Sequence, residues 1–542
     1  MRHGAGCGMT GGKRLDLRQR GPTLVVALLI AAFAAQAIAS ARLESATWDE
    51  THYFGLGTHL LKTRRWDVAG SILHPPLSYG LHSLPLLFAD LPADAFRPLP
   101  EAQRTRRALA GIDVVRGRAL LASPANDGNA LLLSSRLMMI LVGALGAVFV
   151  YRWGRELYGV PAGLLATCLY AFSPNLLAHT RLITPDIALT VFAFGATFFF
   201  WRSLGSQRRC DALWAGVLLG LALLSKFTAL LWPPLFAALL AVWSIRTGQR
   251  PPRRAFAVFG VAGAVLLLGY GFDLRPYVEG IAFQLEHTAE GHPAFFAGRY
   301  ADGGWWYYAL MSLLLKTPLP SLLLLGASAI RLGRRRNRSR WLDEGFVLLP
   351  PLAVIAFFSV QHQSIGLRYV LPALPFLLVF ASGVLATGRL RGFARVALAG
   401  LLAWVLAASL SIHPHYLAYF NETVGGPARG YRYLVDSNLD WGQDLVGLAT
   451  FLRERDIERV HLSYFGTDSP ARYGIRYDWL PSFHLERPNR TREFQLPRHG
   501  WFAISATHLQ GLYLPDRDLY AFLREQQPVA RIGYSIFVYH LE

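Results

Sequence analysis

The chain has 542 residues, of which 53% are hydrophobic and only 16% are charged. A soluble chain of this size would carry about 25% charged residues, so the composition excludes an ordinary soluble protein. The formal net charge of +19 would suit nucleic-acid binding, but the basic residues stand between apolar runs, where they usually set membrane orientation. We therefore expect a multi-span membrane protein that binds membrane lipid and no nucleic acid.

The first apolar segment, residues 22–41, follows a basic tail at residues 1–21. This beginning is similar to a signal peptide, with Ala37-Ile38-Ala39 as a cleavage site. However, the apolar run is longer than the usual signal-peptide core of about 7–15 residues, and further spans follow it. We favour an uncleaved first span, with the tail in the cytoplasm.

An acidic pair follows this span directly, in the stretch Trp48-Asp49-Glu50-Thr51-His52-Tyr53. Carboxylates beside a span are costly unless they face water or a polar pocket, so the pair is a functional candidate. The alternative is a cap for a following helix. Further on, the apolar stretch 77–91 is too short to cross a bilayer and suits an interfacial helix. The charged stretch 93–129 is expected to be loop-like.

Apolar runs bounded by charge predict about eleven transmembrane helices. They cover residues 22–41, 131–151, 161–180, 184–203, 212–229, 230–246, 255–272, 306–330, 345–361, 369–387 and 393–412. Pro233-Pro234 interrupts the almost continuous apolar run that forms the fifth and sixth spans. The alternative to these two spans is one re-entrant hairpin. The predicted transmembrane domain is 22–412, and it includes two outer loops, 42–130 and 273–305.

Lys and Arg are unevenly distributed between the two sides that these spans define. If the N-terminus is inside, the short outer loops hold only Arg181, Lys226, Arg275, Arg299 and Arg368. The inner segments hold many more, among them Arg152, Arg155, Arg202, Arg208, Arg209, Arg246, Arg250, Arg253 and Arg254. The positive-inside rule therefore predicts an N-terminus inside and residues 413–542 outside.

The sequence changes character in this last part, 413–542. Short β-prone runs occur at 460–465, 501–505 and 531–540, with helix-like pieces near 441–453 and 519–526. This pattern predicts a small α/β domain outside the membrane. We see no internal repeat, which counts against a transporter that is built from duplicated halves.

The outward-facing loops of the transmembrane part contain an unusual set of polar residues. Taken singly, each has an ordinary explanation: a helix start, a lysine that reaches the headgroups, an interfacial arginine or an exposed loop histidine. Together, carboxylates and cations beside one leaflet fit a site for a lipid-linked anion and a reaction that needs a carboxylate base. The residues are Asp49, Glu50, Tyr53, His74, Asp186, Lys226, Arg368 and Tyr369.

Glycosyl transfer from a polyprenyl-phosphate sugar suits these groups. The phosphate requires cations, and Lys226 and Arg368 supply them. One carboxylate can deprotonate an acceptor hydroxyl for in-line attack with inversion. The growing negative charge on the phosphate would be stabilised by the same two cations.

The sequence also resembles glycosyltransferase family 39, whose GT-C enzymes include protein O-mannosyltransferases and bacterial lipid A aminoarabinose transferases. The resemblance covers roughly residues 20–412. It lies in the order and position of five short motifs: Asp49-Glu50-Thr51-x-Tyr53, Pro75-Pro76-Leu77, Pro185-Asp186, Leu224-Ser225-Lys226 and Arg368-Tyr369-x-Leu371-Pro372.

This resemblance implies a polytopic α-helical fold of GT-C type and a role for most of these residues. Asp49 would be the base or would orient the acceptor, with Asp186 as a second acidic site residue and Glu50 beside them. Lys226 would bind the donor phosphate, and Arg368 with Tyr369 would flank the donor headgroup. His74 and Tyr53 are assigned to donor and phosphate binding. His74 stands where the aminoarabinose branch has a lysine, so its contact with the phosphate and aminoarabinose as the sugar both remain open.

A second acidic and aromatic stretch, 436–444, lies in the C-terminal part and resembles a stretch of uncharacterised bacterial relatives. Its Asp440 and Trp441 are acceptor-side candidates above the membrane pocket. The alternative is a turn followed by a capped helix that starts near Asp440.

We therefore expect an inverting glycosyltransferase on the outer face of a bacterial cytoplasmic (inner) membrane, with a periplasmic C-terminal domain. Its donor would be a polyprenyl-phosphate sugar, and its acceptor a protein or a glycolipid. The alternatives are a protein O-mannosyltransferase specifically or, from a different class, a lipid-linked-substrate transporter or flippase. We predict no metal or other cofactor: Asp49, Glu50, His52 and His74 are plausible ligands, but their spacing has no metal signature.

Overall fold

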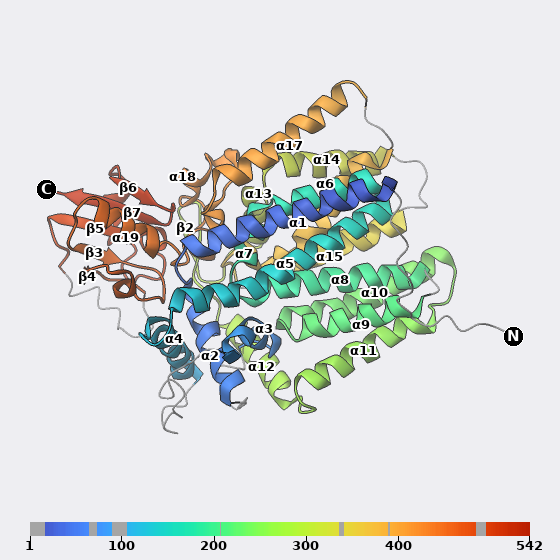
Figure 1. The fold of residues 1–542 in the computed structure, drawn as a ribbon, viewed down its shortest axis with the longest axis horizontal. Coiled ribbons are helices and arrows are strands. Elements are labelled where there is room, and N and C mark those ends of the chain that lie inside the picture. The colour runs from blue at the N-terminus through green and yellow to red at the C-terminus, as the bar shows by residue number, and fades with distance from the viewer. Residues whose placement is uncertain are drawn as a thin grey trace.

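The computed structural model describes residues 17–63, 73–88, 106–205, 208–334, 341–361, 363–387, 391–483 and 495–542. Most of the predicted tail 1–21 therefore lies outside the described residues. A bundle of long apolar helices forms the larger part, and a sheet packed with short helices lies at one end of it (Figure 1). Helix α1 (Leu17–Leu43) begins at the opposite end of the bundle.

The bundle is built from helices whose positions agree with the predicted apolar runs. They are α1 (Leu17–Leu43), α5 (Gly128–Tyr158), α6 (Val160–Ala171), α7 (Pro174–Thr180), α8 (Pro185–Gly205), α9 (Arg209–Leu223), α10 (Trp232–Thr247), α11 (Arg253–Gly269), α13 (Tyr308–Lys316), α14 (Leu319–Arg334), α15 (Trp341–Val360), α16 (Leu374–Ser382) and α17 (Phe393–Ser411). The Pro233-Pro234 pair lies in the first turn of α10, where a missing backbone N–H costs nothing. It begins a helix after the short 3₁₀ turn η5 (Phe227–Leu231).

Six helices of the described residues are long and apolar enough to cross a membrane, or up to eight if two bent pairs each form one span. The pairs are α6 with α7, bent by 61°, and α13 with α14, bent by 113°. Helices α9 and α11 have 15 and 17 residues and fall short of this length. The apolar helical character is thus confirmed, whereas the count of eleven crossings stays a prediction.

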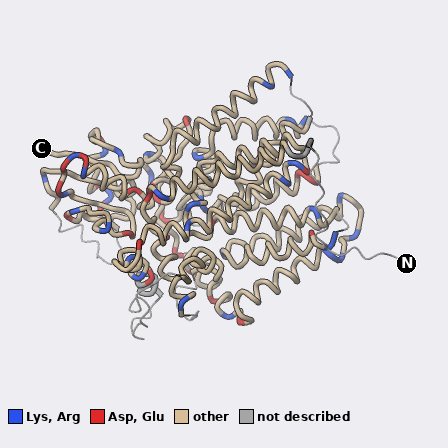
Figure 2. Tube along the Cα trace, in the orientation of Figure 1, with Lys and Arg blue, Asp and Glu red and all other residues tan. Residues whose placement is uncertain are grey.

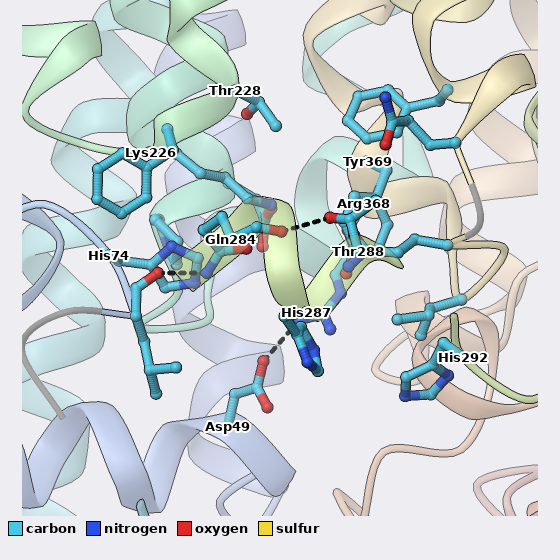
Figure 3. Close-up of a pocket in the computed structure, with 18 of the residues that line it drawn as sticks. Asp49, His74, Lys226, Thr228, Gln284, His287, Thr288, His292, Arg368 and Tyr369 are labelled. Atoms are coloured by element: carbon cyan, nitrogen blue, oxygen red, sulfur yellow. Dashed lines mark hydrogen bonds and ion pairs between the residues drawn. The ribbon is translucent and has the colours of Figure 1, made fainter. Parts of the chain in front are cut away.

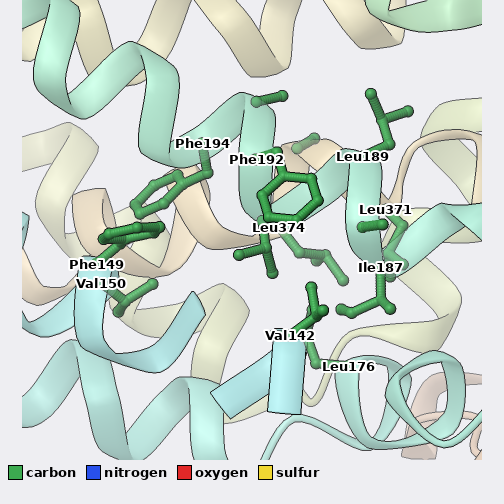
Figure 4. Packing of buried hydrophobic residues seen from close by; sticks show 14 of the residues in the cluster. Val142, Phe149, Val150, Leu176, Ile187, Leu189, Phe192, Phe194, Leu371 and Leu374 are labelled. Atoms are coloured by element: carbon green, nitrogen blue, oxygen red, sulfur yellow. The ribbon is translucent and has the colours of Figure 1, made fainter. Parts of the chain in front are cut away.

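Tight packing inside the bundle depends on small residues and interlocked rings. Phe149 and Val150 on α5 meet Phe194 on α8 and Leu374 on α16 in one buried cluster (Figure 4). A Cβ added at Gly146 on α5 would lie only 2.4 Å from the Tyr170 hydroxyl oxygen, so glycine permits the close approach of α5 and α6.

The first outer loop differs from its prediction in one respect. It contains α2 (Trp48–Thr63), α3 (Leu77–Ser83) and the 3₁₀ helix η2 (Leu84–Phe88), and also α4 (Arg106–Ala122), where a loop was expected. A Cβ on Gly117 of α4 would lie 1.9 Å from the Thr51 carbonyl oxygen of α2, so the two backbones touch. Buried Arg116 and Asp113 form an ion pair of 2.8 Å, which neutralises two of the charges that had suggested a loop.

The second outer loop, 273–305, is also structured. It forms α12 (Arg275–Ala289) and a hairpin of β1 (Ala294–Phe296) and β2 (Arg299–Ala301). Three short 3₁₀ helices follow α15, namely η7 (Leu367–Tyr369), η8 (Leu371–Ala373) and η9 (Gly383–Thr387). Between α15 and α16, η7 brings the predicted Arg368 and Tyr369 to the same end of the bundle as α2 and α12.

The C-terminal part contains the expected mixture of strands and helices. Its five-stranded sheet has the order β4 (Tyr477–Trp479), β3 (Val460–Ser463), β5 (Gly500–Ser505), β7 (Ile536–Leu541) and β6 (Ala530–Ile532). Strand β3 is parallel to both neighbours, and β7 is antiparallel to β5 and β6. The run 531–540 is therefore a hairpin, turned at Gly533 with φ +56°.

The helices of this part are shorter than the sequence suggested. Helix α19 (Leu445–Glu454) begins later than the predicted start near Asp440, and α20 (Ala506–Leu509) and α21 (Ala521–Arg524) have one turn each. One-turn pieces connect the bundle to the sheet: η10 (Tyr416–Ala418), η11 (Glu422–Val424), α18 (Pro427–Gly430) and η12 (Asp436–Asn438), with η13 (Pro470–Tyr473) after β3. The boundary between domains at residue 412 stays a prediction.

Candidate active site

A cavity of about 560 Å³ opens at the end of the bundle that lies towards the sheet. Its wall is formed by the start of α2, residues 73–74, the start of α8, the break between α9 and η5, one side of α12, the end of α15 and η7. It brings together seven of the residues that the sequence singled out: Asp49, Tyr53, His74, Asp186, Lys226, Arg368 and Tyr369.

Asp49 and Arg368, 319 residues apart in the chain, form an ion pair in this cavity (Figure 3). The Arg368 Nη1 donates to the Asp49 Oδ2 over 2.6 Å. Asp49 lies in the first turn of α2, where the helix dipole favours a negative charge. Its side chain keeps 25% of its surface exposed, so solvent and a ligand can both reach it.

Asp186 and Lys226 form the second ion pair of the cavity. The Lys226 Nζ donates to the Asp186 Oδ1 over 2.7 Å. Asp186 follows Pro185 in the first turn of α8, and Lys226 lies where α9 has ended and η5 has not begun. The other oxygen of Asp186 has no hydrogen-bond partner among the described residues, so this pair can accept one more donor.

The two cations are neighbours, because both lie close to the ring of Tyr369. The Lys226 Nζ is 4.7 Å and the Arg368 Cζ 5.4 Å from the centre of that ring. Each cation is balanced by its own carboxylate, so the four groups carry no net charge when the cavity is empty. The Arg368 Nε has no hydrogen-bond partner among the described residues, so an anion that enters can bind this cation beside its carboxylate or in exchange with it.

Tyr53 and His74 line the cavity as a stacked pair. Their ring centres are 5.8 Å apart, and the ring of Tyr79 stacks on the other face of Tyr53 at 5.5 Å. Burial lowers the pKa of His74 well below its usual value, and the charge of Lys226 adds to this effect. His74 is therefore neutral at pH 7 and offers a hydrogen bond rather than a charge to a phosphate.

Glu50 does not reach the cavity, although the sequence grouped it with the catalytic carboxylates. Its side chain is fully buried and receives hydrogen bonds of 2.9 and 2.6 Å from Arg136 of α5. It also accepts from the Thr47 backbone N–H, as the glutamate of a capping box does. Burial would raise the pKa of Glu50, but the charge of Arg136 and these hydrogen bonds hold it below its usual value.

We expect Glu50→Gln to reduce stability more than catalysis. The change leaves Arg136 buried without its counter-charge, and breaking such a pair costs about 3–5 kcal/mol. Thermal unfolding in detergent measures this loss. The matched control is Asp478→Asn, which breaks an exposed pair with Arg459 and should cost under about 1 kcal/mol. If the Glu50→Gln variant unfolds at the same temperature as the wild type but transfers no sugar, Glu50 is a catalytic residue after all.

Asp440 and Trp441 also lie outside the cavity wall. Asp440 is fully buried and accepts a hydrogen bond of 2.9 Å from the Thr507 backbone N–H. Burial raises the pKa of Asp440 to about 8, so it is mostly protonated at pH 7. Trp441 contacts the site from behind, because the Arg368 Cζ lies 4.5 Å from the centre of its ring.

Four polar side chains of the wall that were not predicted come from the predicted second outer loop. They are Gln284, His287, Thr288 and His292, on or just after α12 (Figure 3). The Gln284 Nε2 donates to the Leu73 carbonyl over 2.8 Å and so ties α12 to the residue before His74. The signal in the sequence was the dense polar run 284–292, which interrupts an otherwise apolar region.

Apolar side chains cover the remaining wall of the cavity. Phe227, Leu230 and Leu231 come from η5, and Ile281 and Leu285 come from α12. The cavity therefore joins a charged pocket to an apolar surface, as an amphiphilic ligand requires. Among the described residues, no group of three or more His, Cys, Asp or Glu side chains is arranged to hold a metal ion.

Comparison with known proteins gives a match to one family model over part of the chain and a likeness in fold to solved structures. The family model described as Dolichyl-phosphate-mannose-protein mannosyltransferase matches residues 128–268, the part that carries Asp186 and Lys226. ArnT from Cupriavidus metallidurans in the apo state is 15% identical, with a TM-score of 0.50 over 96% of this chain and 98% of that chain. No curated protein matches the chain significantly.

Two further solved structures match with TM-scores under 0.5. ArnT from Cupriavidus metallidurans bound to undecaprenyl phosphate is 16% identical, with a TM-score of 0.48 over 95% of this chain and 97% of that chain. The Saccharomyces cerevisiae protein O-mannosyltransferase Pmt1-Pmt2 complex bound to the sugar donor is 19% identical, with a TM-score of 0.32 over 51% and 34%.

Proposed function

We propose that this chain, a glycosyltransferase by its family match and of GT-C type by its fold, moves one sugar from a polyprenyl-phosphate donor to an acceptor at the outer membrane surface. One observation carries this proposal: two carboxylate–cation pairs from far-apart segments meet in one cavity that also has an apolar wall. Residues 22–412 would form the transmembrane catalytic domain and residues 413–542 an outer domain.

The donor is assigned to the side of the cavity that holds Lys226 and Arg368. A phosphodiester has one negative charge, and two neighbouring cations match its oxygens, with arginine able to bind two of them at once. The isoprenoid would lie along the apolar residues of η5 and α12, with the Tyr369 ring close to both cations and against the headgroup. His74 and Tyr53 border this headgroup position.

The reaction is written with Asp49 as the base. When the phosphate binds Arg368, this arginine loosens its hydrogen bond to Asp49 and leaves the carboxylate free to accept a proton. The acceptor hydroxyl oxygen then attacks the anomeric carbon while its proton goes to Asp49. The bond between that carbon and the phosphate oxygen breaks on the opposite face, with inversion. Polyprenyl phosphate leaves with two negative charges, which Lys226 and Arg368 stabilise. Asp186 keeps Lys226 in place.

The distribution of charge supports an outer location for this site. Lys and Arg gather at the ends of the bundle helices that lie away from the sheet, where α1 begins (Figure 2). On α8, for example, Asp186 is in the first turn at the cavity and Arg202 is in the last turn. By the positive-inside rule, the basic end faces the cytoplasm, and the cavity and sheet face the periplasm of a bacterial inner membrane.

A protein acceptor is the second candidate, because the matching family model describes a protein mannosyltransferase. Transfer assays with the purified protein in detergent, a panel of polyprenyl-phosphate sugars, and either peptide or glycolipid acceptors separate the two. We expect transfer to one acceptor class, with the anomeric configuration inverted in the product. A protein that transfers and hydrolyses nothing, yet moves the lipid across vesicle membranes, would instead be a flippase, and the proposal would fail.

A further inference from the structure

The segment 436–444, with the sequence Asp-Ser-Asn-Leu-Asp-Trp-Gly-Gln-Asp, lies directly behind the ion pair of Asp49 and Arg368. The sequence suggested it as an acceptor site, but its only acceptor-side carboxylate candidate, Asp440, is buried against Thr507. None of its nine residues is part of the cavity wall. The segment instead contacts the backbone next to Arg368 and the backbone next to Asp49, and these contacts give it a different role.

Asn438 holds the backbone from which Arg368 projects. Its Oδ1 accepts from the Leu367 N–H over 2.9 Å, and its Nδ2 donates to the Ile365 carbonyl over 3.0 Å. Asn438 is itself fully buried, and the Lys316 Nζ donates to its carbonyl oxygen. The turn that carries Arg368 is therefore fixed on both sides of Gly366.

Trp441 holds both members of the pair. Its ring covers the guanidinium of Arg368 at 4.5 Å, so that this cation is fixed from behind while Nη1 points to Asp49. Its carbonyl oxygen accepts from the Trp48 N–H over 2.7 Å, one residue before Asp49. Trp441 has only 2% of its surface exposed, so its contacts are within the protein.

The next residues extend this attachment to the entrance of α2. The Ser45 N–H donates to the Gln443 carbonyl over 2.8 Å, and the Ser45 Oγ donates to the Gly442 carbonyl over 2.9 Å. Gly442 has φ +88°, and a Cβ there would lie 2.7 Å from the Tyr464 hydroxyl oxygen, so this turn requires glycine.

We infer that the segment 436–444 is a positioning element for the transfer reaction, which sets the distance and direction between Asp49 and Arg368 through Asn438 and Trp441. The inference rests on the proposed function. It gives the C-terminal part of the chain a role inside the catalytic centre, because one short segment fixes a base and a phosphate-binding cation that are 319 residues apart in the chain. A displacement near 1 Å in such a site costs on the order of 100-fold in rate.

The test is a double-mutant cycle between Trp441 and Arg368, with undecaprenyl phosphate binding and donor kcat and KM as readouts. We expect Trp441→Leu to weaken binding and lower kcat/KM about 10- to 100-fold, and Trp441→Phe, which keeps a ring over the guanidinium, to stay within about threefold. In an Arg368→Lys background, the same Trp441→Leu change should cost less than about twofold, because lysine does not stack as arginine does.

Trp501→Leu, a partly buried tryptophan of β5, is the matched control and should leave binding and kcat/KM unchanged. If Trp441→Leu does not fold, Asn438→Asp replaces it in the cycle, since it keeps the shape of the side chain and removes the donors to Ile365. If the fold-losses of the two single variants simply multiply in the double variant, the substituted residue of the segment is not coupled to Arg368, and the inference is overturned.

The same measurements separate this inference from the proposed function. A wild-type protein that binds undecaprenyl phosphate but transfers no sugar contradicts the proposed function alone, and the binding cycle still tests the segment. Transfer with multiplicative effects contradicts the positioning role alone. A wild-type protein that neither binds this lipid nor transfers sugar overturns both.

Discussion

Replacing Asp49 by asparagine is expected to abolish glycosyl transfer while the protein stays folded. The amide has the same shape and can still meet Arg368, but it cannot accept the proton of the acceptor hydroxyl. Loss of a general base costs about 10²- to 10⁴-fold in rate. The measurement is kcat for transfer to the acceptor that the wild-type protein uses, together with thermal unfolding in detergent.

Binding of the lipid serves as the control for this variant. Undecaprenyl phosphate should bind to the Asp49→Asn protein as tightly as to the wild type, or more tightly, because Arg368 no longer has a negatively charged competitor. An Asp49→Asn protein with substantial kcat would remove Asp49 from the mechanism. A variant that loses lipid binding but keeps kcat at saturating donor would assign Asp49 to the donor side instead.

The second large effect is expected for Lys226→Ala. This change removes one of the two cations assigned to the phosphate, so the KM for the donor should rise at least tenfold, which corresponds to about 1.4 kcal/mol. It also leaves the buried carboxylate of Asp186 without its partner, and so stability should fall by about 3–5 kcal/mol. Donor titrations and thermal unfolding measure the two effects separately.

A paired variant separates the phosphate contact from the ion pair. Asp186→Asn combined with Lys226→Gln replaces the charged pair by two neutral amides that can bond to each other, so it should recover much of the stability. Its donor KM should stay high, because the cation is still missing. Recovery of donor binding in this neutral pair would show that Lys226 acts through the fold and not through the phosphate.

The convergence of the four charged residues could be predicted from the sequence because membrane topology restricts where they can be. Asp49, Asp186, Lys226 and Arg368 each stand at the predicted outer end of an apolar run, and few polar surfaces are available there. Which carboxylate pairs with which cation could not be predicted, since both pairings join segments far apart in the chain and depend on helix packing.

Glu50 shows where sequence proximity misleads. Neighbouring residues on a helix point about 100° apart, so Asp49 and Glu50 in the first turn of α2 face different surroundings. The partner of Glu50, Arg136, lies 86 residues further on, inside the second predicted span. A buried arginine within a span was the observation that could have indicated a structural ion pair there.

The positioning segment 436–444 shows a second limit of prediction from the sequence. Its acidic and aromatic residues were visible in the sequence, but its contacts with the entrance of α2 are made by backbone groups of Trp441, Gly442 and Gln443. Backbone contacts leave no residue pattern that a sequence can reveal. Helix α12 was missed for a related reason, because its mixed polar and apolar face serves the cavity and not a membrane span.

The most direct test of the account is a structure of the protein with a polyprenyl-phosphate sugar, or undecaprenyl phosphate, bound. We predict phosphate oxygens within hydrogen-bond distance of the Lys226 Nζ and the Arg368 guanidinium, a lipid tail along Leu230 and Leu285, and the Asp49 carboxylate facing the sugar. A phosphate bound elsewhere, with both ion pairs of the cavity intact, would contradict the account.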